Sequence, residues 1–291
     1  MSGNRPRVSI GLPVYNGAPY LSETLDSLLS QTWTDFELIV SDNASTDATE
    51  EICRSYAARD ARIRYLRNRE NLGAAANYNR VFHLSSGEYF KWAAADDVCA
   101  PEFLERCVEA LDREASVVLC YPRAQAIDEQ GNFIRDYPSK PNADSAKPHE
   151  RFYEFVCVPH PCVAVFGLIR ASALRRTQLI GNFASADRPL LSELSLLGRF
   201  FELQEFLFYY RNHPKQSWRA YPTRQAVQAW YDPARAKKLT LPHSRVLREH
   251  LSSIGRAPLD RNERFSCYIC MVWWIRRRWR KLAKNLVLQD I

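Results

Sequence analysis

The sequence contains no apolar run long enough to cross a membrane. A spanning helix needs about 18 or more consecutive apolar residues, and the longest apolar run here, residues 265–275, is interrupted by Ser266. The polar segment at residues 1–7 leads directly into a strand-like run, without the apolar stretch of a secretory signal. We therefore expect a cytoplasmic protein, and peripheral attachment to the cytoplasmic face of a membrane stays open.

A disulfide framework or a complete cysteine-based metal site is also missing. The 8 cysteines are scattered over 291 residues, and several, such as Cys53, Cys107 and Cys120, lie in apolar stretches. Since disulfide frameworks are typical of short secreted chains, we interpret these cysteines as reduced core residues. Cys267 and Cys270 form a single C-x-x-C without a second pair or His cluster at zinc-ligand spacing, which favours two thiols on one helix face over a redox pair or half a zinc site.

Charge is unevenly distributed along the chain. Residues 1–210 hold 22 Lys and Arg against 28 Asp and Glu, whereas residues 211–291 hold 18 against 5. Hydrophobic residues make up 46% of the chain, enough for a packed core, and the length suits one α/β domain with an appended segment. The basic tail carries no nucleic-acid recognition motif, so we expect no nucleic-acid partner.

Short apolar runs alternate with helix-type spacing through the first 112 residues. The run at residues 8–12, closed by Pro13, is typical of a buried parallel strand. The same pattern predicts further strands at 36–40, 63–66 and 89–94, and helices at about 21–29, 47–59, 74–84 and 101–111. This alternation predicts a mostly parallel sheet flanked by helices.

The alternation ends after a strand at residues 117–121. Residues 128–132 are typical of a hairpin turn between short strands, the next clear helix is predicted at 189–197, and a strand follows at 200–210. No internal repeat or low-complexity tract occurs in the chain.

Unusual residues gather in the four loops that follow the predicted strands. Ligands of open α/β sheets bind at the carboxyl ends of strands, so these loops are the candidate site. They contain Pro13-Val14-Tyr15-Asn16, Ser41 to Asp47, Asn68 to Gly73 with Asn71-Leu72-Gly73, and Ala94-Ala95-Asp96-Asp97.

In this order and spacing, with Gln31-Thr32-Trp33 before the second strand, the motifs resemble those of the family-2 group of GT-A glycosyltransferases. The resemblance is close over residues 7–112 and looser to about residue 218. It implies an α/β GT-A fold, Rossmann-like with a mostly parallel sheet flanked by helices, followed by a basic, helical C-terminal extension. The implied domains are a catalytic domain at 1–218, with a nucleotide-binding half at 1–112 and an acceptor half at 113–218, and the extension at 219–291.

The resemblance further implies a site for a nucleotide-sugar donor. The Tyr15 ring stacks on a base such as uracil, and the Asp42 carboxylate accepts a hydrogen bond from the imide N–H of that base. The alternative is that Tyr15 lies in an ordinary loop turn and that Asp42 is an acid in the approach to the next helix. The other residues implied to bind the donor are Pro13, Asn16, Asn71, Gly73, Asn77 and Asp96.

Departure of a diphosphate calls for a divalent cation, Mg²⁺ or Mn²⁺, held by hard oxygen ligands. By resemblance, Asp97 binds the cation directly and Asp96 faces the ribose or the metal shell. Ala94 stands where the commoner D-x-D-D motif has its first Asp, which leaves fewer protein ligands. His213 lies where the family often carries a basic residue near the diphosphate, so it coordinates the cation or neutralises phosphate, with an ordinary surface His as the alternative.

Inversion at the anomeric carbon needs a general base for the acceptor hydroxyl. Asp187 precedes the predicted helix at 189–197 and resembles the family's base position. The alternative is an acid that only stabilises the amino end of that helix.

The expected function is transfer of one sugar from a UDP- or dTDP-type donor, with inversion, onto a glycan or lipid-linked acceptor in cell-surface glycan or glycolipid synthesis. The chain lacks the Q-x-x-R-W pattern and the spanning helices of processive synthases, which favours the transfer of a single sugar. It also lacks the G-x-G-x-x-G motif that a dinucleotide-dependent oxidoreductase would need. A catalytically silent nucleotide-sugar-binding protein of a membrane-associated glycan assembly complex is the alternative. Ala94 favours it, and Asp187 speaks against it.

The apolar run at residues 265–275 is followed at once by the basic run at 276–281. Tryptophans favour the headgroup boundary of a bilayer, and Lys and Arg are attracted to anionic lipids. This segment therefore predicts binding to an anionic membrane surface, or alternatively a C-terminal helix that packs on the catalytic domain.

Overall fold

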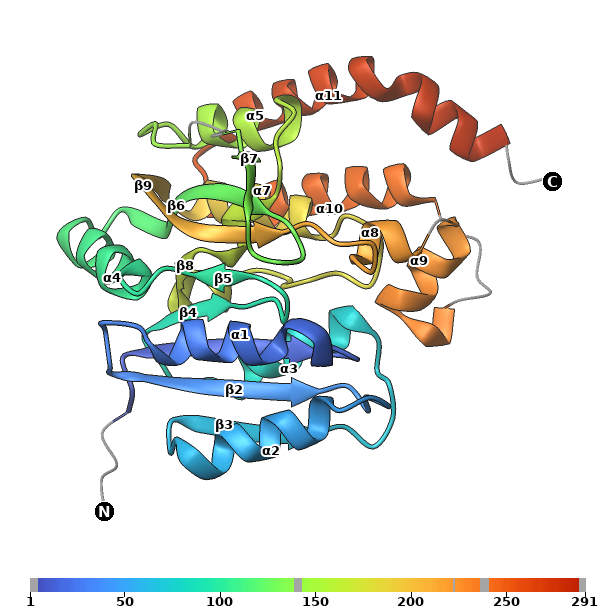
Figure 1. The fold of residues 1–291 in the computed structure, drawn as a ribbon. Coiled ribbons are helices and arrows are strands. Elements are labelled where there is room, and N and C mark those ends of the chain that lie inside the picture. The colour runs from blue at the N-terminus through green and yellow to red at the C-terminus, as the bar shows by residue number, and fades with distance from the viewer. Residues whose placement is uncertain (1–4, 139–142, 222, 236–240, 288–291) are drawn as a thin grey trace.

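The computed structural model describes residues 5–138, 143–221, 223–235 and 241–287, and these form a sheet of nine strands flanked by helices (Figure 1). The strands lie in the order β3-β2-β1-β4-β8-β6-β9-β5, and β7 pairs with β6. In chain order they are β1 (Val8–Val14), β2 (Phe36–Asp42), β3 (Ile63–Arg67), β4 (Tyr89–Trp92), β5 (Val98–Cys99), β6 (Val117–Ile127), β7 (Phe133–Asp136), β8 (Leu168–Arg170) and β9 (Arg199–Arg211).

Helices cover both faces of this sheet. In chain order they are α1 (Ala18–Leu29), α2 (Thr49–Arg59), α3 (Ala74–His83), α4 (Phe103–Arg113), α5 (Pro148–Cys157), α6 (Ala171–Leu174), α7 (Asp187–Leu197), α8 (Ser217–Ala220), α9 (Arg224–Tyr231), α10 (Pro242–Arg256) and α11 (Arg261–Val287). Short 3-10 turns, η1 (Val163–Phe166) and η2 (Pro233–Arg235), complete the order.

The first four main strands confirm the predicted parallel sheet. β1 pairs in parallel with both β2 and β4, and β2 pairs in parallel with β3, so the carboxyl ends of all four meet at one edge. Alternate residues of β2 enter two different cores: Leu38 and Val40 pack with α1, α2 and α4, whereas Ile39 packs with the cluster that contains α3, α5, α7, α10 and α11. This alternation is the period-2 pattern of a strand buried on both faces. The predicted α/β fold is therefore confirmed.

The second half contains two features that the sequence pattern did not predict. β6 runs unbroken from Val117 to Ile127, although Pro122 lacks a backbone N–H. The pairing of β6 with β9 shifts register beside Pro122, which is the kind of irregularity where proline is tolerated in a sheet. Helix α5, at residues 148–157, precedes the helix that we expected to be the next one; its sequence is rich in aromatic residues rather than in leucines at regular spacing.

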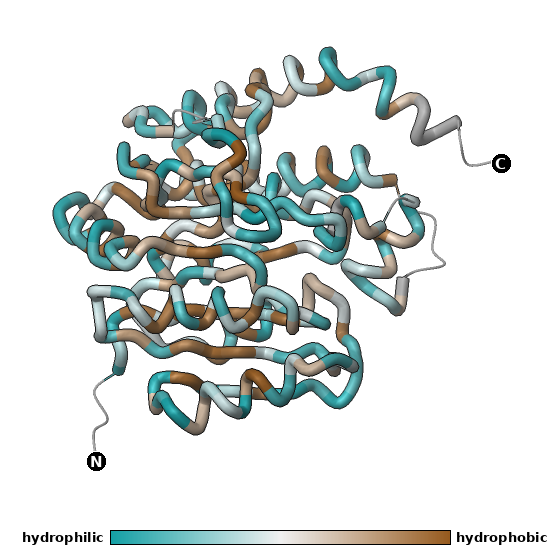
Figure 2. The backbone as a smooth tube through the Cα atoms, viewed as in Figure 1, coloured by the Kyte–Doolittle hydropathy of each residue, from teal (hydrophilic) through white to brown (hydrophobic). Residues whose placement is uncertain are grey.

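The C-terminal segment is helical, as predicted, and packs on the rest of the chain. Side chains of α10 and α11 enter the core cluster that also holds α5 and α7. The brown apolar positions concentrate in the central strands, whereas the helices alternate between brown and teal (Figure 2). Among the described residues, no helix is both long and apolar enough to cross a bilayer.

Candidate active site

A cavity of about 870 Å³ opens where the parallel strands end, a size typical of small-molecule sites. Its walls come from the loops after β1, β2, β3 and β4, the start of α7, the segment after β9, and α9. The predicted site residues that line this cavity are Pro13, Tyr15, Asn16, Asn71, Asn77, Asp96, Asp97, Asp187 and His213. Asp42 and Gly73 are not among the lining residues.

Asp42 ends β2 and is completely buried. Its Oδ1 accepts the Ser45 N–H at 2.8 Å, and its Oδ2 accepts the Tyr65 hydroxyl at 2.9 Å and an Arg67 N–H at 2.8 Å. Burial raises the pKa of the Tyr65 phenol, and the hydrogen bond to Asp42 raises it further. Three of about four acceptor positions of the carboxylate are thus occupied by protein donors, so binding of a base by Asp42 stays a prediction.

Buried asparagines tie the neighbouring loops together. Asn43 Nδ2 donates to Asn71 Oδ1 at 2.8 Å, and Asn68 Nδ2 donates to Asn43 Oδ1 at 2.9 Å. Asn77, on α3, accepts from the Ser41 hydroxyl at 2.7 Å and donates to the Ser41 carbonyl at 2.8 Å. These bonds fix the loops after β2 and β3 against α3, so Asn77 shapes the cavity while its amide is already engaged. The sequence motifs contained Asn43 and Asn68, but spacing alone did not identify their roles.

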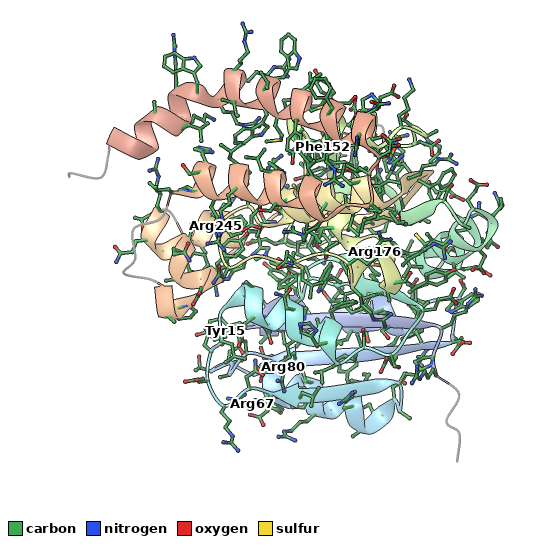
Figure 3. All side chains as sticks on the ribbon, turned by 180° about the vertical axis from the view of Figure 1, so that it is seen from behind. Tyr15, Arg67, Arg80, Phe152, Arg176 and Arg245 are labelled. Atoms are coloured by element: carbon green, nitrogen blue, oxygen red, sulfur yellow. The ribbon has the colours of Figure 1, made fainter. Side chains whose placement is uncertain are left out.

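The loop after β1 presents an accessible aromatic ring. Tyr15 is 42% exposed and lies at the edge where the parallel strands end (Figure 3). Asn16 follows with a φ of 51°, a left-handed conformation that asparagine tolerates well, and its Oδ1 accepts the Thr46 N–H at 2.8 Å. The loop therefore holds the Tyr15 ring over the cavity on a backbone anchored to the neighbouring loop.

Asp96 and His213 are far apart in the sequence but lie within hydrogen-bond distance of each other in the cavity. His213 Nε2 and Asp96 Oδ2 are 2.9 Å apart, and the His213 ring also lies against Tyr20, with ring centroids 4.7 Å apart. His213 is only 6% exposed, and its Nδ1 has no hydrogen-bond partner among the described residues. The alternative that His213 is an ordinary surface histidine is therefore wrong, because its imidazole is buried beside the Asp96 carboxylate.

Asp97 lies deeper than Asp96. Its Oδ1 accepts the backbone N–H of Arg211 at 3.0 Å, and its buried Oδ2 has no hydrogen-bond partner within the described part of the chain. Burial raises the pKa of the Asp97 carboxyl well above its usual range, and the negative charge of Asp96 raises it further. An unpartnered buried carboxylate oxygen is a position that either a proton or a cation satisfies.

Arg211, which the sequence did not mark as important, organises this corner. The side chain is fully buried; Nε donates to the Asp96 carbonyl at 2.9 Å, and Nη1 donates to the Asp128 carbonyl at 3.1 Å. Its Nη2 lies 2.6 Å from a carboxylate oxygen of Glu23 on α1. Arg211 thus joins the end of β9 to the loop after β4, to the β6–β7 turn and to α1.

Asp187 is the first residue of α7 and lines the cavity while remaining partly exposed. Its Oδ1 accepts the N–H of Arg188 at 3.0 Å. Ser185, two residues earlier, has a φ of 63°, which is uncommon for a non-glycine residue. Asp187 therefore lines the same cavity as Asp96 and His213.

The C-terminal segment contributes a wall that the sequence did not predict. Tyr221, Trp230 and Tyr231 line the cavity, and the rings of Tyr221 and Trp230 are 5.9 Å apart. All three lie beyond residue 218, and no motif marked them. The predicted domain boundary stays a prediction, but residues from both of its sides form the cavity.

Gly73 ends the loop after β3, where this loop meets the C-terminal segment. Its φ is 82°, and a Cβ built there would lie 2.6 Å from the Tyr231 carbonyl oxygen and 2.6 Å from Pro233 Cδ. Both the left-handed backbone and the close approach require glycine. Gly73 therefore acts through the packing of α9 rather than through the cavity surface.

Known glycosyltransferases are similar to this chain in sequence. An uncharacterized glycosyltransferase of Methanocaldococcus jannaschii is 27% identical over 233 residues, which cover 78% of each chain. Several other curated relatives are longer, and the chain spans about a fifth of their length.

Two solved structures share the fold over nearly the whole chain. S. aureus TarS, residues 1–349, in complex with UDP-GlcNAc is 17% identical with a TM-score of 0.69, and covers 98% of this chain and 76% of that one. The mannosyltransferase PcManGT from Pyrobaculum calidifontis, in complex with GDP-Man and Mn²⁺, is 18% identical with a TM-score of 0.56, and covers 98% of this chain and 80% of that one. At these identities the likeness concerns the fold alone.

The model of a protein family described as Glycosyl transferase family 2 matches residues 9–176, which include the four loops and the strands that carry them. This match spans more than half of the chain. The chain therefore belongs to glycosyl transferase family 2.

Proposed function

We propose that this glycosyltransferase moves a single sugar from a nucleotide-diphosphate donor of the UDP or dTDP type to an acceptor hydroxyl, with inversion. The observation that supports this proposal is the composition of one cavity. An accessible aromatic ring, Tyr15, stands at its nucleotide side, two acids and an imidazole stand in its middle, and a further acid, Asp187, stands at the start of α7.

The loops after β1, β2 and β3 form the proposed nucleotide site. Tyr15 stacks on the base, and the backbone around Asn43 and Asn71, fixed by the asparagine bonds, approaches the ribose. The TarS structure binds UDP-GlcNAc, which is the basis for a uridine-type donor here. Lys215, exposed at the cavity wall, supplies a cation for the diphosphate.

The residues present fit a divalent cation, Mg²⁺ or Mn²⁺, in part. Asp97 offers a buried oxygen without a hydrogen-bond partner in the described residues, and His213 offers an imidazole beside Asp96. Among the described residues, no three His, Cys, Asp or Glu side chains form a complete metal site. Phosphate oxygens and water would complete the shell, as is common for magnesium. When bound, the cation stabilises the negative charge of the departing diphosphate.

Asp187 is the proposed general base. It takes the proton of the acceptor hydroxyl while the acceptor oxygen forms a bond to the anomeric carbon, and the bond from that carbon to the diphosphate oxygen breaks with its electron pair leaving on the phosphate. Attack from the face opposite the diphosphate inverts the anomeric configuration. The wall of Tyr221, Trp230 and Tyr231 suits the apolar face of a glycan or of a lipid-linked sugar acceptor.

The decisive experiment offers the purified protein a set of nucleotide sugars, with Mn²⁺, with Mg²⁺ and with EDTA. We would measure the nucleoside diphosphate that is released, and we would determine the anomeric configuration of the product by NMR. We expect turnover with a UDP or dTDP sugar, in the presence of the cation, and a product of inverted configuration. Tight binding of the donor without release or transfer would instead support the catalytically silent alternative, and a retained configuration would remove Asp187 from the role of base.

A further inference from the structure

Helix α11 exposes a continuous row of large side chains on the side that faces away from the molecule. Phe265 is 66% exposed, Val272 is 56% exposed, and Trp273 is 54% exposed, and their spacing keeps them on one helical face. We call this row the outer face of α11. Its members are Phe265, Tyr268, Ile269, Val272, Trp273, Arg276, Trp279 and Arg280, all exposed.

The opposite face of the same helix is fixed to the protein. Cys267, Cys270, Met271 and Trp274 are buried in the core cluster. Cys157 Sγ on α5 donates to the Cys270 carbonyl at 3.6 Å, and Arg277 Nη1 donates to the Cys157 carbonyl at 3.0 Å. The interpretation as a core helix therefore holds for one side of α11, and membrane binding by the other, exposed side stays a prediction.

The charge of α11 selects among possible occupants of the outer face. The helix contains eight basic residues and one acidic residue, Glu263 in its first turn, and Arg276 and Arg280 stand within the outer face itself. A second copy of this chain would oppose arginines to arginines in a parallel pairing, and would cover the apolar half with arginines in an antiparallel pairing. An anionic lipid surface, in contrast, takes up apolar side chains and attracts arginine at the same depth.

We propose that the outer face of α11 binds the surface of an anionic bilayer, with the helix lying flat in the headgroup region. Trp273 and Trp279 favour the boundary between headgroups and acyl chains, where an aromatic ring is partly dry and its N–H stays hydrated. Arg276 and Arg280 follow the apolar residues at helical spacing, so they lie on the same face of α11. This surface is independent of the sugar-transfer chemistry.

Helix α11 lies at the outside of the molecule, where a flat surface can reach it. The helix lies across the top of the molecule in both ribbon views, outside α5 and α10, and Phe152 of α5 lies beneath it (Figures 1 and 3). Its carboxyl end runs toward the side on which α9 lies. Helix α9, which lines the cavity, therefore lies on the same side of the molecule as the carboxyl end of α11.

The test is flotation of the full chain with two kinds of vesicle. One consists of phosphatidylcholine alone, and in the other roughly 30% of the lipid is anionic phosphatidylglycerol. One variant, Ile269→Gln with Val272→Gln and Trp273→Gln, removes the apolar row. A second, Arg276→Gln with Arg280→Gln, removes two charges. The matched control is Phe133→Gln with Ile134→Gln on β7, which are 60% and 46% exposed and lie on a separate element.

We expect the wild type and the control to float with anionic vesicles and to bind more weakly at high salt. The charge variant should lose about fivefold in partitioning for each arginine, and the apolar variant should lose binding almost completely. Unchanged circular dichroism and melting temperature show that the variants are folded, since the substituted residues are exposed. If the wild type ignores both vesicles, or if the apolar variant floats as well as the control, the proposal is wrong. Self-association on sedimentation that only the apolar variant abolishes, without vesicle binding, assigns the outer face to a second copy instead.

Discussion

The Asp97 carboxylate accepts the backbone N–H of Arg211 at 3.0 Å, across 114 residues of sequence. This bond joins the loop after β4 to the last residue of β9, two positions before His213. The imidazole of His213 is thereby held 2.9 Å from Asp96. One buried acid thus positions two of the residues that we expect around the diphosphate.

Asp97→Asn tests the cation. The amide oxygen of Asn can still accept the Arg211 N–H, whereas the negative oxygen that a cation requires is gone. We expect UDP to raise the melting temperature of the wild type more in Mn²⁺ than in EDTA, and the variant to lose this difference. Glu102→Gln, an exposed change outside the cavity, is the control and should keep it. Equal cation dependence in wild type and Asp97→Asn would remove Asp97 from the metal shell.

Asp42→Asn separates two roles of a buried acid. The loss of the ion pair with Arg67 should lower the free energy of unfolding by about 1–3 kcal/mol, measured by urea denaturation. Donor affinity should fall by a similar amount if Asp42 also binds the base. Glu50→Gln, which removes the partly exposed acid that pairs with both Arg67 and Arg54, should change stability by less than about 1 kcal/mol. A loss of stability with unchanged calorimetric affinity for UDP would restrict Asp42 to scaffolding.

Asp187→Asn should fold and bind donor normally but turn over about 10²–10⁴ times more slowly, the usual contribution of a positioned general base. The Asn oxygen can keep the bond to the Arg188 N–H, so α7 should remain intact. Single-turnover kinetics and donor binding by calorimetry give the two quantities. Parallel losses of affinity and rate would indicate that Asp187 only stabilises the start of α7.

His250 gives the protein an acid-sensitive core. Its Nδ1–H donates to Ser192 Oγ at 2.9 Å, because the Ser192 hydroxyl itself donates to the Pro189 carbonyl. Burial, with smaller effects from Arg278 and Arg188, lowers the pKa of His250 from 6.5 to about 3. Between pH 6.5 and about 3, His250 is protonated in the unfolded chain but neutral in the folded chain. The free energy of unfolding therefore decreases as pH falls through this range.

The slope attributable to this one group is about 1.4 kcal/mol per pH unit below 6.5. Urea denaturation at pH 5 and pH 7 should show a larger loss on acidification for the wild type than for His250→Gln, whose amide can also donate to Ser192. The same pH dependence in both proteins would mean that His250 is not the group responsible.

The early sequence pattern predicted the parallel sheet because each strand there is a short apolar run that ends in a polar loop. Asp96, His213 and Asp187 could be predicted from their motifs, and the structure brings all three to one cavity. The motifs could not reveal that Asp42 is enclosed by Tyr65 and Arg67, since those partners come from the neighbouring strand through pairing alone.

Other features had no local signal. Arg211 became important only because β9 ends beside α1 and the β6–β7 turn, a contact that spacing along the chain does not encode. Helix α5 is aromatic-rich, and its burial depends on α7 and α11 arriving later in the sequence. Trp230 reaches the cavity because α9 packs against the loop after β3, which the composition of α9 does not indicate.

The contact between Gly73 and the Tyr231 carbonyl has a consequence for chimaeric enzymes. A crossover at residue 218 would follow the predicted domain boundary, yet it would bring a foreign backbone against the loop that ends in Gly73, where even a methyl group finds no room. Recombination libraries built from this scaffold should therefore exchange residues 68–73 together with 221–233 as a single block. Residues whose side chains face the cavity, such as Tyr221 and Trp230, can then be diversified separately.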